Sequence, residues 1–537
     1  MTQPADILLT NASVLTFDAN QPHADTVVVT GNIISFVGHE ADSEAWRGPN
    51  TYVIDCQQTT LMPGIIDSHF HLYAGSKTAG DVDLRGIKDM AEVRARILEF
   101  AEENSDAPWL TAHAAAYSLP NPDTVMHRTH LDEIVADRPL VLFAHDLHAL
   151  WLNTKALEQT HLLHGPDNPE LRSDMTFDSD GLATGEMVEG AVFAFVNHYM
   201  PSDEAFMTNA VKRSLEQLAS FGITSIHNML GDDAQGKLYK GLEQAGDLTC
   251  RVYLPYYVDP SINAETLATE ASALRDTYAS NLLHTGAVKF FSDGVYDGKT
   301  ALTLEGYPDE PENLGTSIFE RAHYLELVTQ ADALGFQIAT HAVGDGAVRL
   351  ALDAYEQARD TNGTRDSRHR VEHIEIINPS DIPRFAELGV ISSMQPLHAP
   401  TSPVNADLWF KHVPQARWQD AFAVRRLRDA GAHVVLGSDW SVVTMNPFVS
   451  WQAAVTRKPW GDEGNAHFQQ NLVEVMAGYT KDAAYAEFQE AHKGQLKVGM
   501  LADMVLLSED VIALPTEDLG NLTVKLTIMD GKIVYAA

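Results

Sequence analysis

The sequence predicts an α/β protein whose main part is a (β/α)8 barrel, also called a TIM barrel. In the middle of the 537-residue chain, apolar runs alternate with helix-like stretches, which is typical of a parallel sheet. Eight such runs favour a closed barrel over an open sheet. Both ends of the chain contain only short strands and turns instead. The runs are Leu61–Asp67, Ile223–His227, Cys250–Tyr257, Ala287–Ser292, Phe336–His341, Arg370–His373, Val390–Gln395 and His433–Asp439.

The two ends of the chain predict a second, smaller domain. Near the N-terminus, Gly31-Asn32 separates two β-rich runs, and Asp530-Gly531 marks a hairpin turn near the C-terminus. Neither end holds enough strands for a sandwich by itself. We therefore expect residues 1–60 and 494–537 to form one composite β-sandwich, with residues 61–493 forming the barrel.

A long insertion is predicted after the first barrel strand. The stretch between the first two strands, residues 76–205, is far too long for an ordinary crossover connection. We expect it to have a small core of its own. Because loops at that end of a barrel lie above the active site, the insertion is predicted to act as a lid.

Composition excludes several classes of function. The chain is 45% hydrophobic and 21% charged, as in ordinary globular proteins. Its 74 acidic and 37 basic side chains give a formal net charge of −37, which repels phosphate backbones and anionic lipid. We therefore expect a small-molecule substrate and no nucleic-acid or membrane partner. A homodimer is the default oligomeric state for such a protein.

Cysteine content and the termini give further expectations. Two cysteines, Cys56 and Cys250, exclude a disulfide framework and a cysteine-rich zinc site. The N-terminus lacks a basic patch followed by an apolar core, so no signal peptide is predicted. No apolar stretch is long enough to span a membrane. A cytoplasmic location is the expectation.

The first barrel strand ends with two histidines. Side chains alternate along a strand, so Asp67, His69 and His71 face one way and Phe70 faces the other. Two imidazoles at the barrel mouth can hold one metal ion. Asp67 has two open interpretations: a hydrogen bond to a ligating imidazole, or a role as a buried carboxylate of the turn.

Other predicted strands also end in residues that can bind metal. His341 ends the fifth strand, His373 the sixth and Asp439 the eighth. Alone, each histidine is more typical of a hydrogen-bonded core residue, and the aspartate of a turn. Together they lie where barrel enzymes place catalysis, at the C-terminal ends of the strands. The pattern therefore predicts a metal centre.

Lys289 lies inside an apolar run of the fourth strand. A buried ammonium is costly unless it is paired or neutralised. Two alternatives stay open: a salt bridge with a carboxylate, or reaction with carbon dioxide to give a carbamate that bridges two metal ions.

Five further residues are weaker candidates for substrate contact. Three lie in the insertion, one follows Lys289 and one follows Asp439. Packing is the alternative for the aromatic ones, and Asp293 is expected to shape the barrel mouth. They are His145, His148, Trp151, Asp293 and Trp440.

These motifs together resemble the amidohydrolase superfamily, and specifically the branch that contains N-substituted formamide deformylase. The similarity covers essentially the whole chain. It is carried by Pro63-Gly64-Ile-Ile-Asp67-Ser-His69-Phe-His71, Lys289-Phe-Phe-Ser-Asp293-Gly294, Thr340-His341-Ala-Val-Gly344-Asp345, His373, Gly437-Ser438-Asp439-Trp440, His145-Asp146-Leu-His148-Ala-Leu-Trp151-Leu-Asn153 and Leu496-Lys-Val-Gly499-Met-Leu-Ala502-Asp503.

The resemblance implies a set of roles. Hydrolysis of a non-peptide carbon–nitrogen bond, of amide or formamide type, is the implied reaction. Zinc is the expected metal, as one or two ions, with manganese or iron as alternatives. The implied ligands are His69, His71, His341, His373 and Asp439, with Lys289 carboxylated in two-metal members.

The expected mechanism uses a metal-activated hydroxide that attacks a carbonyl carbon. Asp439 is expected to act as general base and then general acid. With a single ion, His373 is expected to turn toward substrate or water. Alternatives are an ester or phosphoester hydrolase, a decarboxylase or an isomerase on the same metal barrel. A non-catalytic, metal-binding regulatory protein is a further alternative.

Overall fold

The computed structural model describes residues 4–78, 82–105, 107–121, 124–200, 204–400, 408–458, 460 and 469–537. The chain forms two compact units. One contains Met1–Leu72, Val211–Trp440 and Thr444–Ala537, and the other contains Tyr73–Ala210 with Ser441–Val443.

Parallel strands form the centre of the first unit. Neighbouring strands pair in parallel from β8 through β15 to β16, and from β17 through β19, β20, β21 and β22 to β23. The Asp439 N–H donates to the His69 carbonyl and the His71 N–H to the Trp440 carbonyl, which joins the chain after β23 to β8. The result is a TIM-barrel-type fold. These strands are β8 (Ile65–Phe70), β15 (Ile223–Asn228), β16 (Arg251–Tyr253), β17 (Tyr256–Tyr257), β19 (Ala287–Phe291), β20 (Gln337–Ala342), β21 (Arg370–His373), β22 (Ile391–Met394) and β23 (His433–Leu436).

Two predicted strands are divided in the structure. Leu61–Asp67 breaks at Gly64, so that β7 (Thr60–Pro63) joins a terminal sheet and β8 enters the barrel. A Cβ at Gly64 would collide with the Thr224 side chain, so only a glycine fits against Thr224 at this break. Cys250–Tyr257 breaks at Pro255, which has no N–H to donate to a neighbouring strand.

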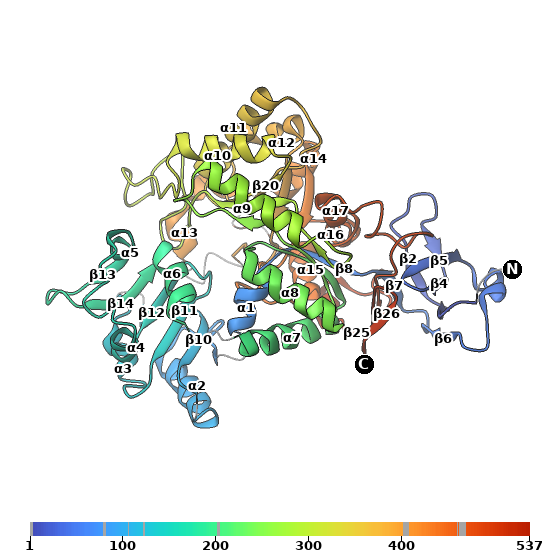
Figure 1. Cartoon of the computed structure of the whole chain (residues 1–537), viewed down its shortest axis with the longest axis horizontal. Helices are drawn as coiled ribbons and strands as arrows, with labels where there is room; N and C mark the ends of the chain where they lie inside the picture. Colours follow the sequence, from blue (N-terminus) through green and yellow to red (C-terminus); the bar gives the residue numbers. More distant parts are fainter. Residues whose placement is uncertain are drawn as a thin grey trace. The chain divides into compact units, whose positions relative to one another are not determined.

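Helices follow most of the barrel strands and lie outside them (Figure 1). Local sequence sets their ends: the Asp232 side chain accepts the Gln235 N–H at the start of α8, and Gly246 ends it in a left-handed conformation. The helices are α7 (Glu204–Ser220), α8 (Asp233–Ala245), α9 (Ala264–Thr277), α10 (Arg321–Ala333), α11 (Asp345–Asn362), α12 (Ile382–Leu388), α13 (Leu408–His412), α14 (Val424–Asp429), α15 (Pro447–Thr456), α16 (Leu472–Gly478) and α17 (Lys481–Ala486).

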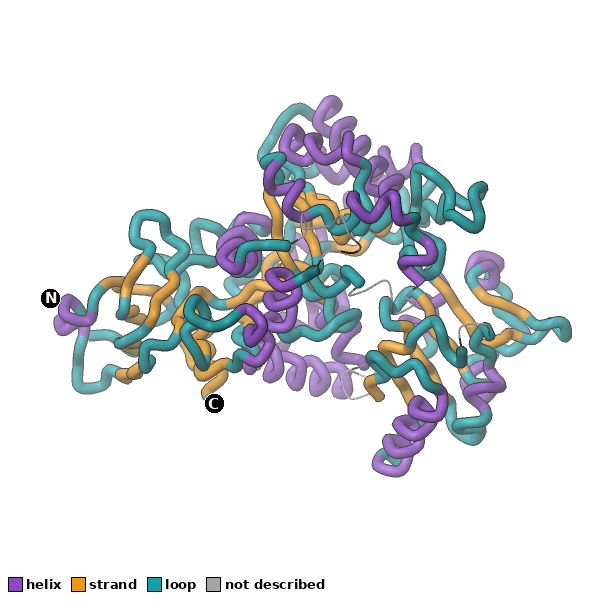
Figure 2. Tube along the Cα trace, turned by 180° about the vertical axis from the view of Figure 1, so that it is seen from behind, coloured by secondary structure: helices purple, strands orange, loops and turns teal. Residues whose placement is uncertain are grey.

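Two further sheets of this unit come from both ends of the chain, and Figure 2 shows their strands near both termini. Their strand orders are β5-β4-β1-β6 and β26-β25-β24-β7-β2-β3. Leu9 and Val27 from one sheet share a hydrophobic cluster with Leu61, Leu506 and Ile528 from the other. The strands are β1 (Ile7–Thr10), β2 (Ser13–Leu15), β3 (His23–Ala24), β4 (Thr26–Thr30), β5 (Ile33–Gly38), β6 (Tyr52–Asp55), β24 (Met504–Leu507), β25 (Val524–Met529) and β26 (Lys532–Ala536).

The second unit has a six-stranded sheet in the order β13-β14-β12-β11-β10-β9. Val93, Ile97, Leu142 and Trp151 belong to its core. Among the described residues of the whole chain, no helix has the length and apolarity needed to cross a membrane. The elements of the insertion are α1 (Leu72–Thr78), β9 (Val82–Asp83), α2 (Met90–Glu103), β10 (Leu110–Ala115), α3 (Arg128–Asp132), β11 (Leu140–Ala144), β12 (Ala149–Leu152), α4 (Thr154–Gln159), α5 (Pro169–Ser173), β13 (Met175–Phe177), β14 (Ala183–Val188) and α6 (Gly190–His198).

Candidate metal centre

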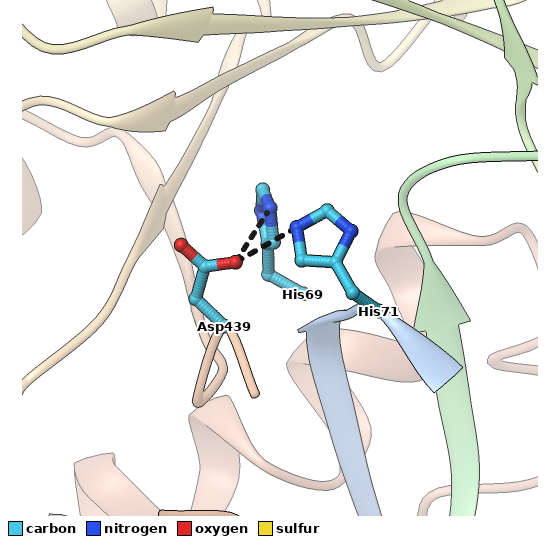
Figure 3. A group of neighbouring side chains, drawn as sticks. All are labelled: His69, His71 and Asp439. Atoms are coloured by element: carbon cyan, nitrogen blue, oxygen red, sulfur yellow. Dashed lines mark ion pairs between the residues drawn. The ribbon is translucent and has the colours of Figure 1, made fainter. Parts of the chain in front are cut away.

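The two histidines at the end of β8 face the same carboxylate. Asp439 Oδ1 lies 2.9 Å from His71 Nε2 and 3.4 Å from His69 Nε2 (Figure 3). All three side chains are buried, and their ligand atoms lie within 4.8 Å of one another. Phe70, between the histidines, faces the other way and stacks on Trp440 with ring centroids 5.0 Å apart. Strand alternation therefore places two imidazole nitrogens and one carboxylate oxygen around a common point.

The second oxygen of Asp439 faces another pair of histidines. Asp439 Oδ2 lies 3.8 Å from His373 Nδ1 and 3.5 Å from His398 Nε2. The rings of His373 and His398 are nearly parallel, 6° apart, with centroids 5.6 Å apart. The three side chains again satisfy the spacing of a metal-binding group. Asp439 thus lies between two imidazole pairs, with one oxygen toward each.

The backbone conformation sets the direction of two of these side chains, those of Asp439 and His373. Asp439 has φ 61° and His373 has φ 77°, a left-handed conformation that costs a non-glycine residue about 1–2 kcal/mol. Such strain is characteristic of functional sites. At His373 this backbone conformation changes the direction of the side chain, so the alternation of side chains along β21 does not extend to its last residue.

Asp67 holds the turn that carries Asp439. Its carboxylate accepts the Ser438 N–H at 2.9 and 3.1 Å and the His69 N–H at 3.2 Å. Burial raises the pKa of Asp67 to about 7, although these donors oppose the shift. Of the two interpretations of Asp67, the structure supports the turn carboxylate. The carboxylate that contacts Nδ1 of His69 is instead Glu372, whose Oε2 lies 2.7 Å away.

His341 joins the same cluster from β20. Its ring centroid lies 4.5 Å from that of His373, which in turn lies 4.7 Å from His69. His341 Nε2 is 3.2 Å from the Gly294 carbonyl oxygen, and His373 Nδ1 is 2.9 Å from Gln395 Oε1. The structure therefore brings all four predicted histidines into one cluster, in which His69, His71 and His373 face Asp439 and His341 packs against His373.

Burial keeps the central imidazoles neutral. It lowers the pKa of His69 to about 4 and that of His373 well below its usual value. Burial opposes ionisation of Asp439, but His69 and His71 outweigh it and hold the Asp439 pKa well below its usual value. Neutral imidazoles and an ionised carboxylate are the forms that bind metal. The donor set fits a divalent cation.

Lys289 is completely buried on β19. Its Nζ has no hydrogen-bond partner within the described part of the chain and lies 4.6 Å from the centre of the Phe291 ring. Burial lowers the pKa of Lys289 to about 8, despite the opposing charges of Glu372 and Asp439. Among the described residues no carboxylate forms a salt bridge with Lys289, so the structure does not support the first of the two alternatives.

Asp293 and Trp440, predicted to contact substrate, are occupied by the protein. Asp293 is fully buried, and its carboxylate accepts the N–H groups of Leu302, Val343 and Gly344 at 2.9–3.0 Å. These bonds fix the loop after β19. Trp440 is buried against Phe70. Asp293 and Trp440 therefore have partners within the protein, and their role in substrate contact stays a prediction.

The three candidates of the insertion have partners inside that unit. His148 Nδ1 lies 2.9 Å from Glu189 Oε2. The Trp151 indole N–H donates to Glu186 Oε1 at 3.3 Å. The His145 ring packs edge-on against a tyrosine, Tyr117. Their role in substrate contact stays a prediction.

Sequence reasoning missed two residues of the site. The sequence does hold a signal for Glu372, because Arg370 and Glu372 within an apolar strand indicate an internal ion pair. His398 lies three residues after Gln395, in the loop after β22. Its only signal was a histidine soon after a predicted strand.

Comparison with known proteins reveals relatives along the full length. Protein LONG AFTER FAR-RED 3 of Arabidopsis thaliana is 26% identical over 540 residues, which cover 99% of this chain and 92% of that protein. N-substituted formamide deformylase of Arthrobacter pascens is 26% identical over 547 residues, covering 100% and 99%. A crystal structure of an uncharacterized metal-dependent hydrolase from Pyrococcus horikoshii OT3 has the same fold. Its TM-score is 0.75 at 23% identity, with 95% of this chain and 99% of that chain covered.

The sequence pattern of one family extends over nearly the whole chain. The Amidohydrolase family matches residues 52–535, a range that includes every residue of the cluster around Asp439. This protein therefore belongs to the amidohydrolase family of metal-dependent hydrolases.

Proposed function

We propose that this protein hydrolyses a non-peptide carbon–nitrogen bond, of amide or formamide type, in a small-molecule substrate. The observation that carries the proposal is the position of Asp439, with each carboxylate oxygen facing a pair of buried histidines. Similarity over the full length to a formamide deformylase supports the choice of bond. The large acidic excess of the chain disfavours a phosphate-bearing substrate.

The first cation position is formed by His69, His71 and Asp439 Oδ1. A second position is formed on the other side of the carboxylate, where Oδ2 faces His373 and His398. His341, whose ring contacts His373, is a further ligand candidate there. Imidazole and carboxylate ligands suit zinc best, with manganese and iron as alternatives.

A divalent cation at this site lowers the pKa of a bound water and polarises a carbonyl oxygen. The protein supplies the rest. Asp439 is ionised and accepts a proton from the attacking water, then returns it to the leaving nitrogen. His373, held by Gln395 at 2.9 Å, orients the substrate carbonyl when only the first position is filled.

Lys289 is proposed to become a carbamate. Its neutral amine attacks the carbon of carbon dioxide, a nitrogen–carbon bond forms, and the displaced N–H proton leaves to solvent. The product is an anion in place of a buried amine that has no hydrogen-bond partner within the described residues. Intact-protein mass spectrometry after carbonate and metal loading tests this: a mass increase of one carbon dioxide is expected in the wild type and not in Lys289→Met.

The function is tested by turnover of the metal-loaded protein on matched substrates. The panel contains N-formyl amines, N-acyl amines, cyclic amides, and the corresponding esters and phosphoesters. Faster hydrolysis of the amide or formamide than of its matched ester and phosphoester is expected, and chelation of the metal should abolish it. Turnover of esters or phosphoesters alone would contradict the choice of bond. Metal binding without any turnover would favour the regulatory alternative.

A further inference from the structure

Strand β21 places an ion pair inside the barrel, directly beneath the metal centre. Arg370 and Glu372 are two residues apart, face the same side, and are both 0% exposed. Arg370 Nε donates to Glu372 Oε1 at 2.8 Å, and Nη2 donates to Oε2 at 3.1 Å. Burying two charges costs several kcal/mol for each ion unless their geometry is good. Stability alone therefore does not explain why an ion pair is buried this deeply.

Glu372 also contacts a residue of the metal centre. Its Oε2 lies 2.7 Å from His69 Nδ1. A carboxylate that pairs with arginine only accepts hydrogen bonds, so Nδ1 of His69 must carry the proton. A neutral imidazole has one such proton, which leaves the lone pair on Nε2. Nε2 is the atom that faces Asp439 Oδ1 at 3.4 Å.

We propose that Glu372 is a positioning residue that fixes the tautomer and ring orientation of His69, so that Nε2 is presented to the cation, and that Arg370 holds Glu372 in place. The proposal rests on the proposed metal centre. It assigns to β21 two functions: His373 at its end lines the site, and the ion pair below it orients the ligand from β8.

Arg370 connects this carboxylate to neighbouring strands. Its Nη1 donates to His227 Nδ1 at 2.7 Å, and its Nη2 donates to the Ser68 carbonyl at 2.7 Å and to Ser393 Oγ at 3.0 Å. Ser68 directly precedes His69. One guanidinium therefore holds both the backbone next to His69 and the carboxylate that contacts its ring. The ligand is ordered before a cation arrives, which reduces the entropy lost on binding.

The test uses Glu372→Gln and a matched control, Asp332→Asn. Asp332 is also a buried carboxylate that contacts a histidine, His369 Nε2 at 3.2 Å, and an arginine, Arg365 Nη2 at 2.7 Å. Neither of its partners belongs to the metal centre. Both variants remove one charge from such a triad and keep the side-chain size.

Zinc affinity is measured by competition with a chelator, together with thermal unfolding of the metal-free proteins. Glu372→Gln should bind zinc about 10- to 100-fold more weakly than the wild type, whereas Asp332→Asn should keep the wild-type affinity even where it unfolds at a lower temperature. Equal zinc affinity of Glu372→Gln and wild type would overturn the proposal. An equal loss in both variants would also overturn it, because a general loss of structure would then explain the effect. A wild-type protein that binds no zinc, manganese or iron would instead contradict the proposed function.

A second measurement uses the wild type, so the test does not depend on the folding of Glu372→Gln. The metal-free protein is labelled with 15N-histidine, and the His69 signals are identified by their absence in His69→Asn. The nitrogen shifts should indicate a protonated Nδ1 and an unprotonated Nε2 for His69. The opposite tautomer would overturn the proposal.

Discussion

Two buried histidines in this barrel have similar neighbours and different roles. His69, at the C-terminal end of the strands, contacts Glu372, which pairs with Arg370. His369, just before β21 at the opposite end, contacts Asp332, which pairs with Arg365. Both triads combine an imidazole, a carboxylate and a guanidinium.

The two histidines differ in what their second ring nitrogen contacts. His369 Nδ1 accepts the Ile338 N–H at 3.1 Å while Nε2 faces Asp332, so both nitrogens are used by the protein. His69 uses only Nδ1 in this way, and its Nε2 points at the oxygen of Asp439. A buried histidine with both nitrogens bonded to the protein stabilises the fold. In a buried histidine such as His69, one nitrogen faces a carboxylate oxygen without donating a proton to it. That nitrogen is available to a cation.

Removing the charge of Asp439 should produce the largest effect at the metal end. Asp439→Asn is expected to lower kcat by about 10²- to 10⁴-fold, because the proton acceptor is lost. Steady-state kinetics of the variant and the wild type check this expectation. Wild-type turnover in this variant would refute the proton-transfer role.

The proposed second cation position predicts that a substitution of His398 lowers the metal content of the protein. His398→Gln should lose the second equivalent of metal and keep the first, because His398 faces Asp439 Oδ2 whereas His69 and His71 face Oδ1. Elemental analysis after loading with excess zinc and desalting gives the stoichiometry. His369→Gln is the control and should keep the full content. If His398→Gln retains every equivalent, His398 is not a ligand.

The base of the barrel should show the opposite pattern, a loss of stability with activity retained. Burial opposes ionisation of Asp332, but His369 and the amide of Asn362 lower its pKa to about 2 from a usual value of 3.8. A lowered pKa in the folded state stabilises the protein above about pH 4, and this contribution is lost as the pH falls toward about 2.

Asp332→Asn should therefore cost about 2 kcal/mol of unfolding free energy at neutral pH, and the difference from wild type should shrink between about pH 4 and pH 2. Urea unfolding across this range measures it. A difference that stays constant with pH would show that the ionised carboxylate is not the stabilising form.

The smallest effect is expected at Trp440. Its ring stacks on Phe70 behind the histidines, so Trp440→Phe should keep KM unchanged and cost about 1 kcal/mol of stability, as for one aromatic pair. Kinetics on the best substrate of the panel and thermal unfolding separate the alternatives. A large rise in KM with unchanged stability would instead support Trp440 as a substrate contact.

Strand periodicity predicted much of this molecule. Each predicted central run overlaps an observed strand, and the clustering of His69, His341, His373 and Asp439 was predicted from their positions at the ends of those strands. The divisions at Gly64 and Pro255 were not anticipated, because a run of apolar residues does not reveal where the chain passes from one sheet to another.

Residues reached through long-range contacts were harder to predict. Glu372 contacts His69 across 303 positions of sequence, and the local pattern indicates its pairing with Arg370 but not this contact. His398 lies in a loop, where no periodicity indicates direction. The sequence left two roles open for Asp67, because its hydrogen-bond partner, the Ser438 N–H, lies 371 residues away along the chain.

The passage of the chain from β7 to β8 has a consequence for biosynthesis. A single glycine separates the strand that carries His69 from a strand held between β2 and β24. The histidine pair leaves the ribosome long before Asp439 and β24 are made. A nascent chain therefore cannot assemble a complete cation site until Asp439 has been synthesised.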